Sequence, residues 1–150
     1  MEINKFYIAG KFITPDGKEI IDLINPATEE KVGHVISGSE KDVNDAVVAA
    51  KQAFQDASAL SLEQKKTILQ EIIDGMDERR EEFAQVISEE MGSPIKVARG
   101  AHFSSGKVHF VNTLKVIDDF SFSEIHDNIT LNKLPIGPVG MITPWNWPLN

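Results

Sequence analysis

The side chain best suited to chemistry is the carboxamide of Asn146, near the end of the sequence. Asn146 lies between Trp145 and Trp147, and Pro144 and Pro148 flank the three residues. Each proline fixes φ and lacks an N–H, which stiffens the segment. A carboxamide shielded by two rings offers two N–H donors with little freedom, and such donors can stabilise a developing oxyanion. The pattern also fits a loop at a strand end, where Asn146 satisfies backbone carbonyls and the rings pack.

Other polar patterns are weaker candidates for chemistry. His102 and His109 share a helix face at a spacing of seven, but no carboxylate lies between them, so surface or packing roles are favoured over a metal site. Glu89 and Glu90 are adjacent, and neighbours on a helix do not face each other, so they are not an acid–base pair. The sequence contains no cysteine. This excludes disulfides, zinc–thiolate sites, iron–sulfur clusters and a cysteine nucleophile within these residues.

The composition is that of a globular chain of about one domain. The 150 residues carry 15 Lys and Arg against 23 Asp and Glu, a net charge of −8. Acidity without a basic patch argues against nucleic-acid binding, because phosphate contacts supply most of that affinity. No apolar run reaches the roughly 18 to 20 residues of a membrane span, and the N-terminus lacks the pattern of a secretory signal. We therefore expect a cytoplasmic protein that binds no nucleic acid and no membrane.

Residues 6–36 are expected to form short strands. Residues 6–13 predict a hairpin that turns at Ala9–Gly10. Residues 19–24 and 31–35 are expected to be extended, and the Asn-Pro-Ala-Thr stretch at residues 25–28 breaks the chain between them.

Residues 39–118 are expected to be helical. Gly75 and the charged run after it predict a break, and Gly92 predicts a helix end. Ser93–Pro94 has the pattern of an N-cap and first position of a last helix, which runs towards Ile117. Two pairs have the spacing of a capping box and are each followed by an apolar stripe: Ser39 with Asp42, and Ser61 with Gln64.

Residues 119–150 are expected to return to strands. Phe120–Phe122 and Ile129–Leu131 flank a turn, and Val139–Ile142 is an apolar run bounded by Pro and Gly, as in a buried strand. A single buried strand needs partners. The chain therefore resembles the N-terminal part of a longer α/β protein. The alternative is a small protein whose last strand pairs with residues 6–36.

An ordered series of motifs resembles the NAD(P)-dependent aldehyde dehydrogenase superfamily. The most specific is Gly137–Pro148, which is similar to the strand that enters the family's cofactor domain and the loop that holds its oxyanion Asn. Four earlier stretches resemble, in order, the family's opening hairpin, its Asn-Pro-Ala-Thr turn, its first helix and one of its helix ends: residues 7–12, 24–28, 42–50 and 89–94. The likeness spans nearly the whole chain.

The resemblance implies an α/β fold in which N-terminal strands and helices lead into the first strand of a Rossmann-type cofactor sheet, in a chain that is incomplete. Residues 1–118 would be the strand hairpins and the helical part of the cofactor-binding domain. Residues 119–136 would be the strand pair of an oligomerisation element, and residues 137–150 the first strand and oxyanion loop of the cofactor sheet. The full-length protein would be a homodimer or homotetramer.

The implied reaction is oxidation of an aldehyde to a carboxylic acid with NAD or NADP, NAD being favoured. A Cys thiolate attacks the aldehyde, an Asn side chain and a backbone N–H stabilise the oxyanion, hydride leaves to the cofactor, and a Glu activates water. By the motif match, Asn146 takes the oxyanion role. The same match assigns a cofactor contact to Ile142, Thr143, Pro144 and Trp145, and a monovalent cation site to Leu23 and Glu90.

The sequence departs from the family by omission. It has no Cys, no Gly-x-Thr-x-x-Gly turn for the cofactor phosphates and no Glu-Leu-Gly-Gly-Lys segment for the base. Two hypotheses follow. The chain is the N-terminal portion of an aldehyde dehydrogenase and is inactive alone, or it is a truncated, non-catalytic fragment that acts only as a packing or association module.

Overall fold

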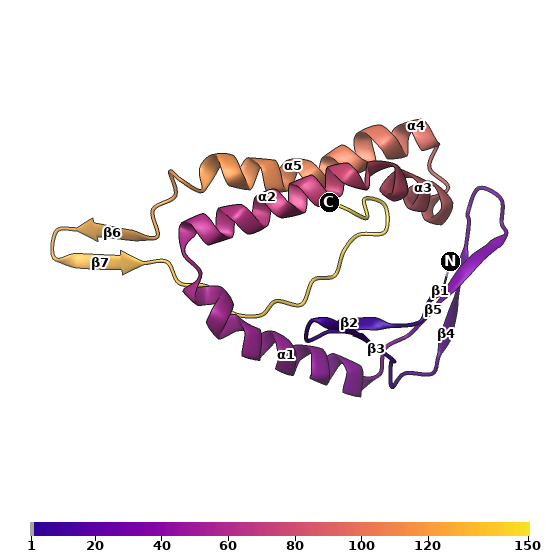
Figure 1. The fold of residues 1–150 in the computed structure, drawn as a ribbon, viewed down its shortest axis with the longest axis horizontal. Coiled ribbons are helices and arrows are strands. Elements are labelled where there is room, and N and C mark those ends of the chain that lie inside the picture. Colours follow the sequence, from indigo (N-terminus) through magenta and orange to yellow (C-terminus); the bar gives the residue numbers. More distant parts are fainter. Residues whose placement is uncertain (1) are drawn as a thin grey trace.

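The computed structural model describes residues 2–150, with small strands at both ends of a helical middle (Figure 1). The elements in chain order are β1 (Glu2–Ile3), β2 (Phe6–Ile8), β3 (Lys11–Ile13), β4 (Ile20–Ile24), β5 (Lys31–Ile36), α1 (Glu40–Ala59), α2 (Leu62–Glu78), α3 (Arg80–Met91), α4 (Ile95–Val97), the π-helical turn η1 (Ala98–His102), α5 (Phe103–Val116), β6 (Ser123–His126) and β7 (Ile129–Asn132). The chain is therefore mixed α/β, as predicted.

The N-terminal strands form two separate sheets. In the three-stranded sheet β5 is central, parallel to β1 and antiparallel to β4. β2 and β3 form the predicted hairpin, with Phe6 opposite Ile13. Its turn has positive φ at Ala9 (52°) and Gly10 (78°), which is the geometry that a tight hairpin requires. The strands expected within residues 6–36 are thus confirmed.

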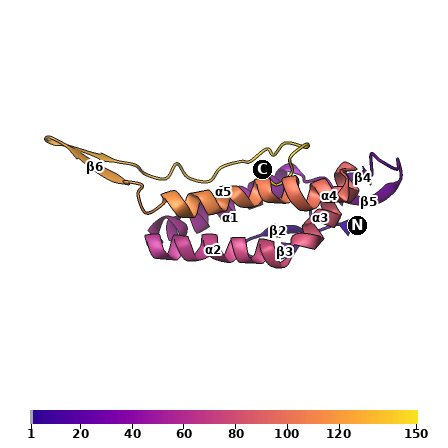
Figure 2. The same ribbon diagram turned by 90° about the horizontal axis from the view of Figure 1, so that it is seen from above.

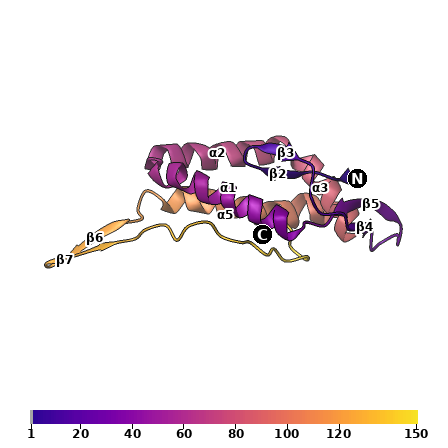
Figure 3. The ribbon, with the colours of Figure 1, turned by 90° about the horizontal axis from the view of Figure 1, so that it is seen from below.

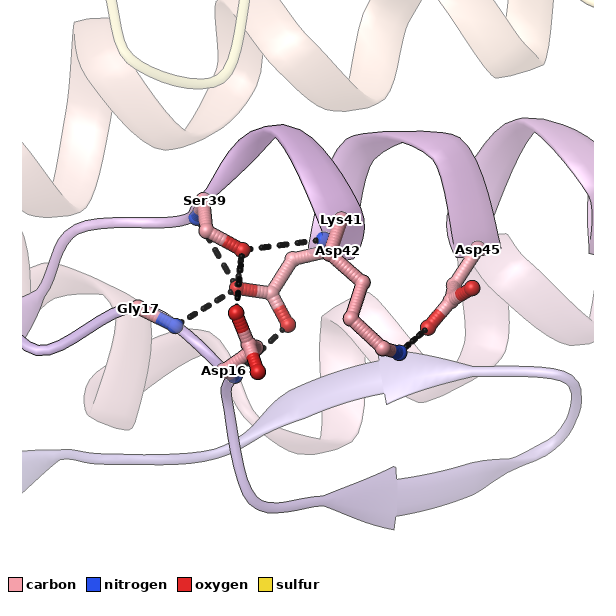
Figure 4. A network of polar contacts seen from close by, with 6 residues as sticks. All are labelled: Asp16, Gly17, Ser39, Lys41, Asp42 and Asp45. Carbon is pink, nitrogen blue, oxygen red and sulfur yellow. Dashed lines mark hydrogen bonds and ion pairs between the residues drawn. The ribbon is translucent and has the colours of Figure 1, made fainter.

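The start of α1 is fixed by the buried carboxylate of Asp42 (Figure 4). It accepts hydrogen bonds from the backbone N–H groups of Asp16 (2.8 Å), Gly17 (2.9 Å) and Ser39 (2.9 Å). The bonds from Asp16 and Ser39 outweigh the effect of burial and hold the pKa of Asp42 well below its usual range. One carboxylate therefore caps α1 and ties the loop before β4 to it. The capping boxes predicted at the starts of α1 and α2 are both present.

The core lies where α2, α3, η1 and α5 meet. The ring of Phe103 is only 1% exposed, with the Phe83 ring at 6.0 Å and the Arg80 guanidinium at 5.0 Å from its centre. Arg99 in η1 donates two hydrogen bonds to Glu81 in α3 (2.6 and 2.7 Å), which lower the pKa of Glu81 to about 2. The buried apolar residues in the described chain are Ile73, Met76, Ala84, Ile87, Ala98 and Phe103.

The expected break between the second and third helices is confirmed, and one other expected helix boundary is wrong. α2 continues through Gly75 to Glu78, and the break falls at Arg79, within the charged run that follows Gly75. A glycine inside a helix costs only about 0.5–1 kcal/mol, and the burial of Ile73 and Met76 on either side outweighs it. Beyond α3, Pro94 rather than Ser93 is the N-cap residue, and the helix passes through the π-helical turn before it continues as α5. The predicted end at Gly92 is confirmed, with φ of 66°.

The strand expected at Val139–Ile142 does not form. Within residues 2–150, the backbone of residues 134–146 makes no hydrogen bond. A strand needs a neighbour to accept and donate its bonds, and neither residues 6–36 nor any other described strand lies beside it. The alternative hypothesis of a small protein, in which this last strand pairs with residues 6–36, is therefore wrong as well.

The strand pair near the C-terminus begins later than expected. β6 and β7 pair with Ser123 opposite Asn132, and the turn between them has φ of 53° at Asp127. Phe120–Phe122 precedes β6 instead of forming the strand, although the carbonyl of Phe122 still accepts a hydrogen bond from the N–H of Lys133 (2.8 Å). The rings of Phe120 and Phe122 pack edge to face, with centres 4.8 Å apart. The hairpin is confirmed, with its first strand shifted.

The elements leave much apolar surface uncovered. Figures 2 and 3 show α2 on one side of α5 and the C-terminal segment on the other, while the β6–β7 hairpin projects beyond the helices. Ile125 of the hairpin is 78% exposed, and Val43 and Val47 of the predicted α1 stripe are also exposed. No helix within residues 2–150 is long and apolar enough to cross a membrane.

The Asp42 network predicts a defined dependence of stability on pH. The pKa of Asp42 is lower in the folded chain than in the unfolded chain, where it is near 3.9. The carboxylate therefore makes its full contribution to the free energy of unfolding above the unfolded pKa, and this contribution is lost as the pH falls through the folded pKa. Asp42→Asn should therefore lower the urea midpoint of the chain at pH 7, and the difference from wild type should narrow below about pH 4. Asp45→Asn, at an exposed partner of Lys41, is the control. A difference for Asp42→Asn that stays constant with pH would contradict this role of the carboxylate.

Candidate functional site

The segment that carries Asn146 is fixed to α5 by Leu149. A Cβ added to Gly106 of α5 would lie 2.6 Å from Leu149 Cβ and 3.0 Å from its carbonyl carbon, so no side chain fits between them. Leu149 also packs against the buried cluster of Ala84, Ile87 and Ala98. The end of the segment therefore belongs to the main core.

Two further contacts hold the same turn. The ring of Trp147 packs on the ring of His102, with centres 4.7 Å apart and planes at 47°. His109 Nε2 lies 2.6 Å from Asn150 Oδ1. The backbone N–H of Asn150 donates to the carbonyl of Trp147 (3.0 Å), which closes the turn. The residues after Asn146 are thus anchored at three points on one continuous helical stretch.

The carboxamide of Asn146 is exposed directly before these anchors. Trp145 is 87% exposed and Trp147 38% exposed, so the two rings do not shield Asn146 from water as the sequence suggested. The side chain of Asn146 makes no hydrogen bond within the described residues, so it does not satisfy backbone carbonyls either. Its two N–H donors are free to bind a group that this chain does not contain.

A cleft of about 310 Å³ joins most of the predicted site residues. Thr143, Pro144 and Trp145 line one part of it, and Leu23 and Glu90 line another. Ile142 and Asn146 adjoin this stretch in sequence but do not line the cleft. The complete lining is Leu23, Ile24, Glu90, Met91, Thr143, Pro144, Trp145 and Pro148.

The far side of the cleft is built where the Asn-Pro-Ala-Thr turn meets the end of α3. Asn25 Oδ1 accepts a hydrogen bond from the N–H of Ala27 (2.8 Å), which holds the turn. A Cβ on Gly92 would lie 3.0 Å from both Ala27 N and Pro26 Cγ. Gly92 also has a φ that favours glycine. This close approach brings Leu23, before the turn, and Glu90, before Gly92, to the same cleft.

The cleft supplies one carboxylate, and residues 2–150 hold no group of three His, Cys, Asp or Glu side chains that could bind a metal ion. A cation there would rely on Glu90 and on oxygens such as the Leu23 carbonyl, and this site stays a prediction. Residues 142–145 are exposed and their backbone groups are unpaired within the described chain. This edge is accessible to a ligand, and its predicted contact with the cofactor stays a prediction.

Sequence reasoning missed the residues that anchor the segment. It placed His102 and His109 on one helix face but gave them no role beyond packing, and it did not connect Gly106 with Leu149. The seven-residue spacing was the available signal for the histidines. Nothing in the sequence pattern pairs Gly106 with a residue 43 positions later, a separation (149 − 106) that only the folded chain closes.

Comparison with known proteins gives one consistent family. The sequence profile of the "Aldehyde dehydrogenase family" matches residues 12–150. A relative from Staphylococcus haemolyticus that carries an aldehyde dehydrogenase name is 35% identical over 144 residues, which are 96% of this chain and 30% of that protein. The chain thus spans about a third of the length of the curated relatives it matches.

Two solved structures have similar folds. The crystal structure of a mutant of aldehyde dehydrogenase C from Pseudomonas syringae, in complex with NAD+ and octanal, is 40% identical, with a TM-score of 0.94 over 97% of this chain and 30% of that one. Aldehyde dehydrogenase 21 from Physcomitrella patens, in complex with the reaction product succinate, is 29% identical, with a TM-score of 0.83 over 98% of this chain and 32% of that one.

The close approach at Gly106 predicts that this position is intolerant of any side chain. Gly106→Ala should lower the free energy of unfolding by about 1–3 kcal/mol, the usual cost of overpacking. Gly75→Ala is the matched control, because nothing lies within 4 Å of its added Cβ and alanine favours the helix by about 0.5–1 kcal/mol. Urea unfolding followed by circular dichroism measures both. Equal stability of the two variants would show that Leu149 does not press on α5.

Proposed function

Because the chain belongs to the aldehyde dehydrogenase family, we propose that it is the N-terminal portion of an enzyme that oxidises an aldehyde to a carboxylic acid with a nicotinamide dinucleotide. The observation that carries the proposal is the exposed carboxamide of Asn146, which has no partner within residues 2–150 and directly precedes a turn fixed to α5. A donor held ready in this way suits an oxyanion hole.

Asn146 is proposed to donate Nδ2–H to the oxygen that becomes negative when a thiolate adds to the aldehyde. The donor contributes most when it is fixed before the reaction, because no reorganisation is then needed as charge develops. The three anchors after Asn146 supply that fixation. The 150 residues contain no cysteine, so the thiolate and the base that activates water belong to parts of the protein outside them.

Residues 142–145 are proposed to lie along the ribose and nicotinamide side of the cofactor. Their exposed side chains and unpaired backbone groups fit this role. The bound cofactor supplies the hydride acceptor, and NAD is favoured over NADP. Thr143, Pro144 and Trp145 would orient it from the wall of the cleft, with Leu23 and Glu90 on the other wall as the proposed site of a monovalent cation.

The β6–β7 hairpin is proposed to be the oligomerisation element of the full-length homodimer or homotetramer. Its exposed Ile125 and Ile129, on a ribbon that projects from the helices (Figure 1), suit a buried position between subunits. Residues 1–118 and 137–150 would then contribute to the cofactor-binding domain, and the rest of that domain would pair with the unbonded backbone of residues 134–146.

A chimera tests the proposal in a complete enzyme. This chain would replace the matching N-terminal part of the wild-type Pseudomonas syringae aldehyde dehydrogenase C, and NAD+ reduction with octanal would be followed at 340 nm. We expect the chimera to turn over octanal and the 150-residue chain alone to be inactive. A folded chimera without activity, as judged by circular dichroism and gel filtration, would favour the alternative of a non-catalytic packing module.

Within an active chimera, Asn146→Ala should lower kcat by about 100- to 1000-fold, the usual effect of removing one oxyanion donor. Asn112→Ala removes the same group from an exposed position on α5 and should leave kcat unchanged. Turnover of Asn146→Ala close to that of the parent chimera would rule out the oxyanion role.

A further inference from the structure

We propose that His102 and His109 are positioning residues for the carboxamide of Asn146, an inference that rests on the proposed function. Neither histidine is expected to touch substrate or cofactor. Both act through the turn of residues 147–150, which follows Asn146 directly. The two contacts hold opposite ends of this turn, so together they fix where it begins and ends on the helix.

Each end of the turn has its own histidine. At the start, the Trp147 ring rests on the His102 ring with centres 4.7 Å apart. At the end, His109 Nε2, in the tautomer that carries its proton there, donates to Asn150 Oδ1 (2.6 Å). The backbone hydrogen bond from Asn150 to Trp147 couples the two ends. Loss of either histidine contact would therefore loosen the turn at both ends, while Leu149 stays packed against Gly106.

The environment of His102 indicates that its ring, not its nitrogens, makes the contact. The residue is only 8% exposed, and its Nδ1 is buried without a hydrogen-bond partner among the described residues. A buried nitrogen without a hydrogen bond is unfavourable. The contact with Trp147 does not use Nδ1, so it depends on the flat shape of the His102 ring.

The π-helical turn lets this stretch make two unlike contacts. π-helical turns inside helices are often found at functional sites. Arg99, within η1, reaches Glu81 of α3, while His102, at its end, faces Trp147. Because η1 has more residues per turn than an α-helix, Arg99 and His102 point in different directions around the helix axis. From His102 on, the regular α5 places His109 on the same face two turns later.

A rigid helix that fixes both ends of the turn leaves little freedom to Asn146. Misplacement of a reacting group by about 1 Å can cost about 100-fold in rate. Because the oxyanion develops after the aldehyde binds, the loss should fall on kcat and spare KM. This pattern separates positioning from substrate binding.

The chimera described above tests the proposal with rescue variants. His109→Ala and His102→Ala should each lower kcat by about tenfold or more with KM for octanal nearly unchanged. His109→Gln keeps an N–H donor for Asn150, and His102→Phe keeps a ring against Trp147, so both should recover most of the activity. Asn112→Ala is again the control. Loss without rescue by either variant would overturn the proposal.

A double-mutant cycle separates positioning from general stability. If the histidines act through Asn146, His109→Ala should have no further effect on kcat in a chimera that already carries Asn146→Ala. A merely structural role would lower kcat by the same factor in both backgrounds, and that result would overturn the proposal.

A fluorescence measurement on the 150-residue chain does not depend on activity. Trp145→Phe leaves Trp147 as the single tryptophan. In that background His109→Ala should raise the acrylamide quenching constant of Trp147, while His109→Gln and Asn112→Ala should leave it near the parent value. Unchanged quenching in His109→Ala would overturn the proposal. An inactive chimera whose chain still passes this test would refute the proposed function and leave the two anchors of the turn established.

Discussion

The candidate site depends on the absence of a side chain at Gly106. Only because α5 presents bare backbone there can Leu149 approach closely enough to join the buried cluster of α3 and η1. That contact is apolar and tight, and close packing of this kind transmits small displacements instead of absorbing them. It sets the distance between the C-terminal segment and the helix, and at that distance Trp147 contacts His102 and Asn150 contacts His109.

The anchored turn contrasts with the residues before it. Residues 134–146 make no backbone hydrogen bond within the described chain, and Ile136 and Ile142 are almost fully exposed. Backbone donors and acceptors beside apolar side chains are what a central strand presents to its neighbours. The segment therefore has the chemistry of a strand without the partners that would make it one. The chain covers about 30% of the relatives it matches, and a sheet supplied by the rest of such a protein would satisfy both needs at once.

Local interactions were predictable from the sequence, and distant ones were not. The capping boxes at Ser39 and Ser61 and the helix end at Gly92 depend on residues a few positions apart, and each is present. The predicted break between α2 and α3 falls in the charged run at Arg79 and not at Gly75 itself, because burial of Ile73 and Met76 in the core outweighs the weak local preference of a glycine. The strand predicted at Val139–Ile142 does not form, because a strand needs a neighbouring strand to bond with and no described strand lies beside these residues. The family resemblance pairs Leu23 with Glu90, whereas the meeting of these two residues with Thr143–Trp145 and the approach of Leu149 to Gly106 were not predicted from the sequence.

These differences explain why the motif identifies a candidate site but does not determine which contacts position it. The motif supplies an amide with free donors, and its prolines limit the conformations of the loop. The position of the turn after Asn146 is set by the helix. Its π-helical turn places His102 against Trp147, and α5 places His109 against Asn150. The rings of Trp145 and Trp147 do not enclose Asn146, so the exclusion of water that strengthens an oxyanion hole is not achieved within these residues. In the proposed function, the helical part of this chain orients the donor, and the low-dielectric surroundings that make the donor effective would come from a surface that covers residues 134–146.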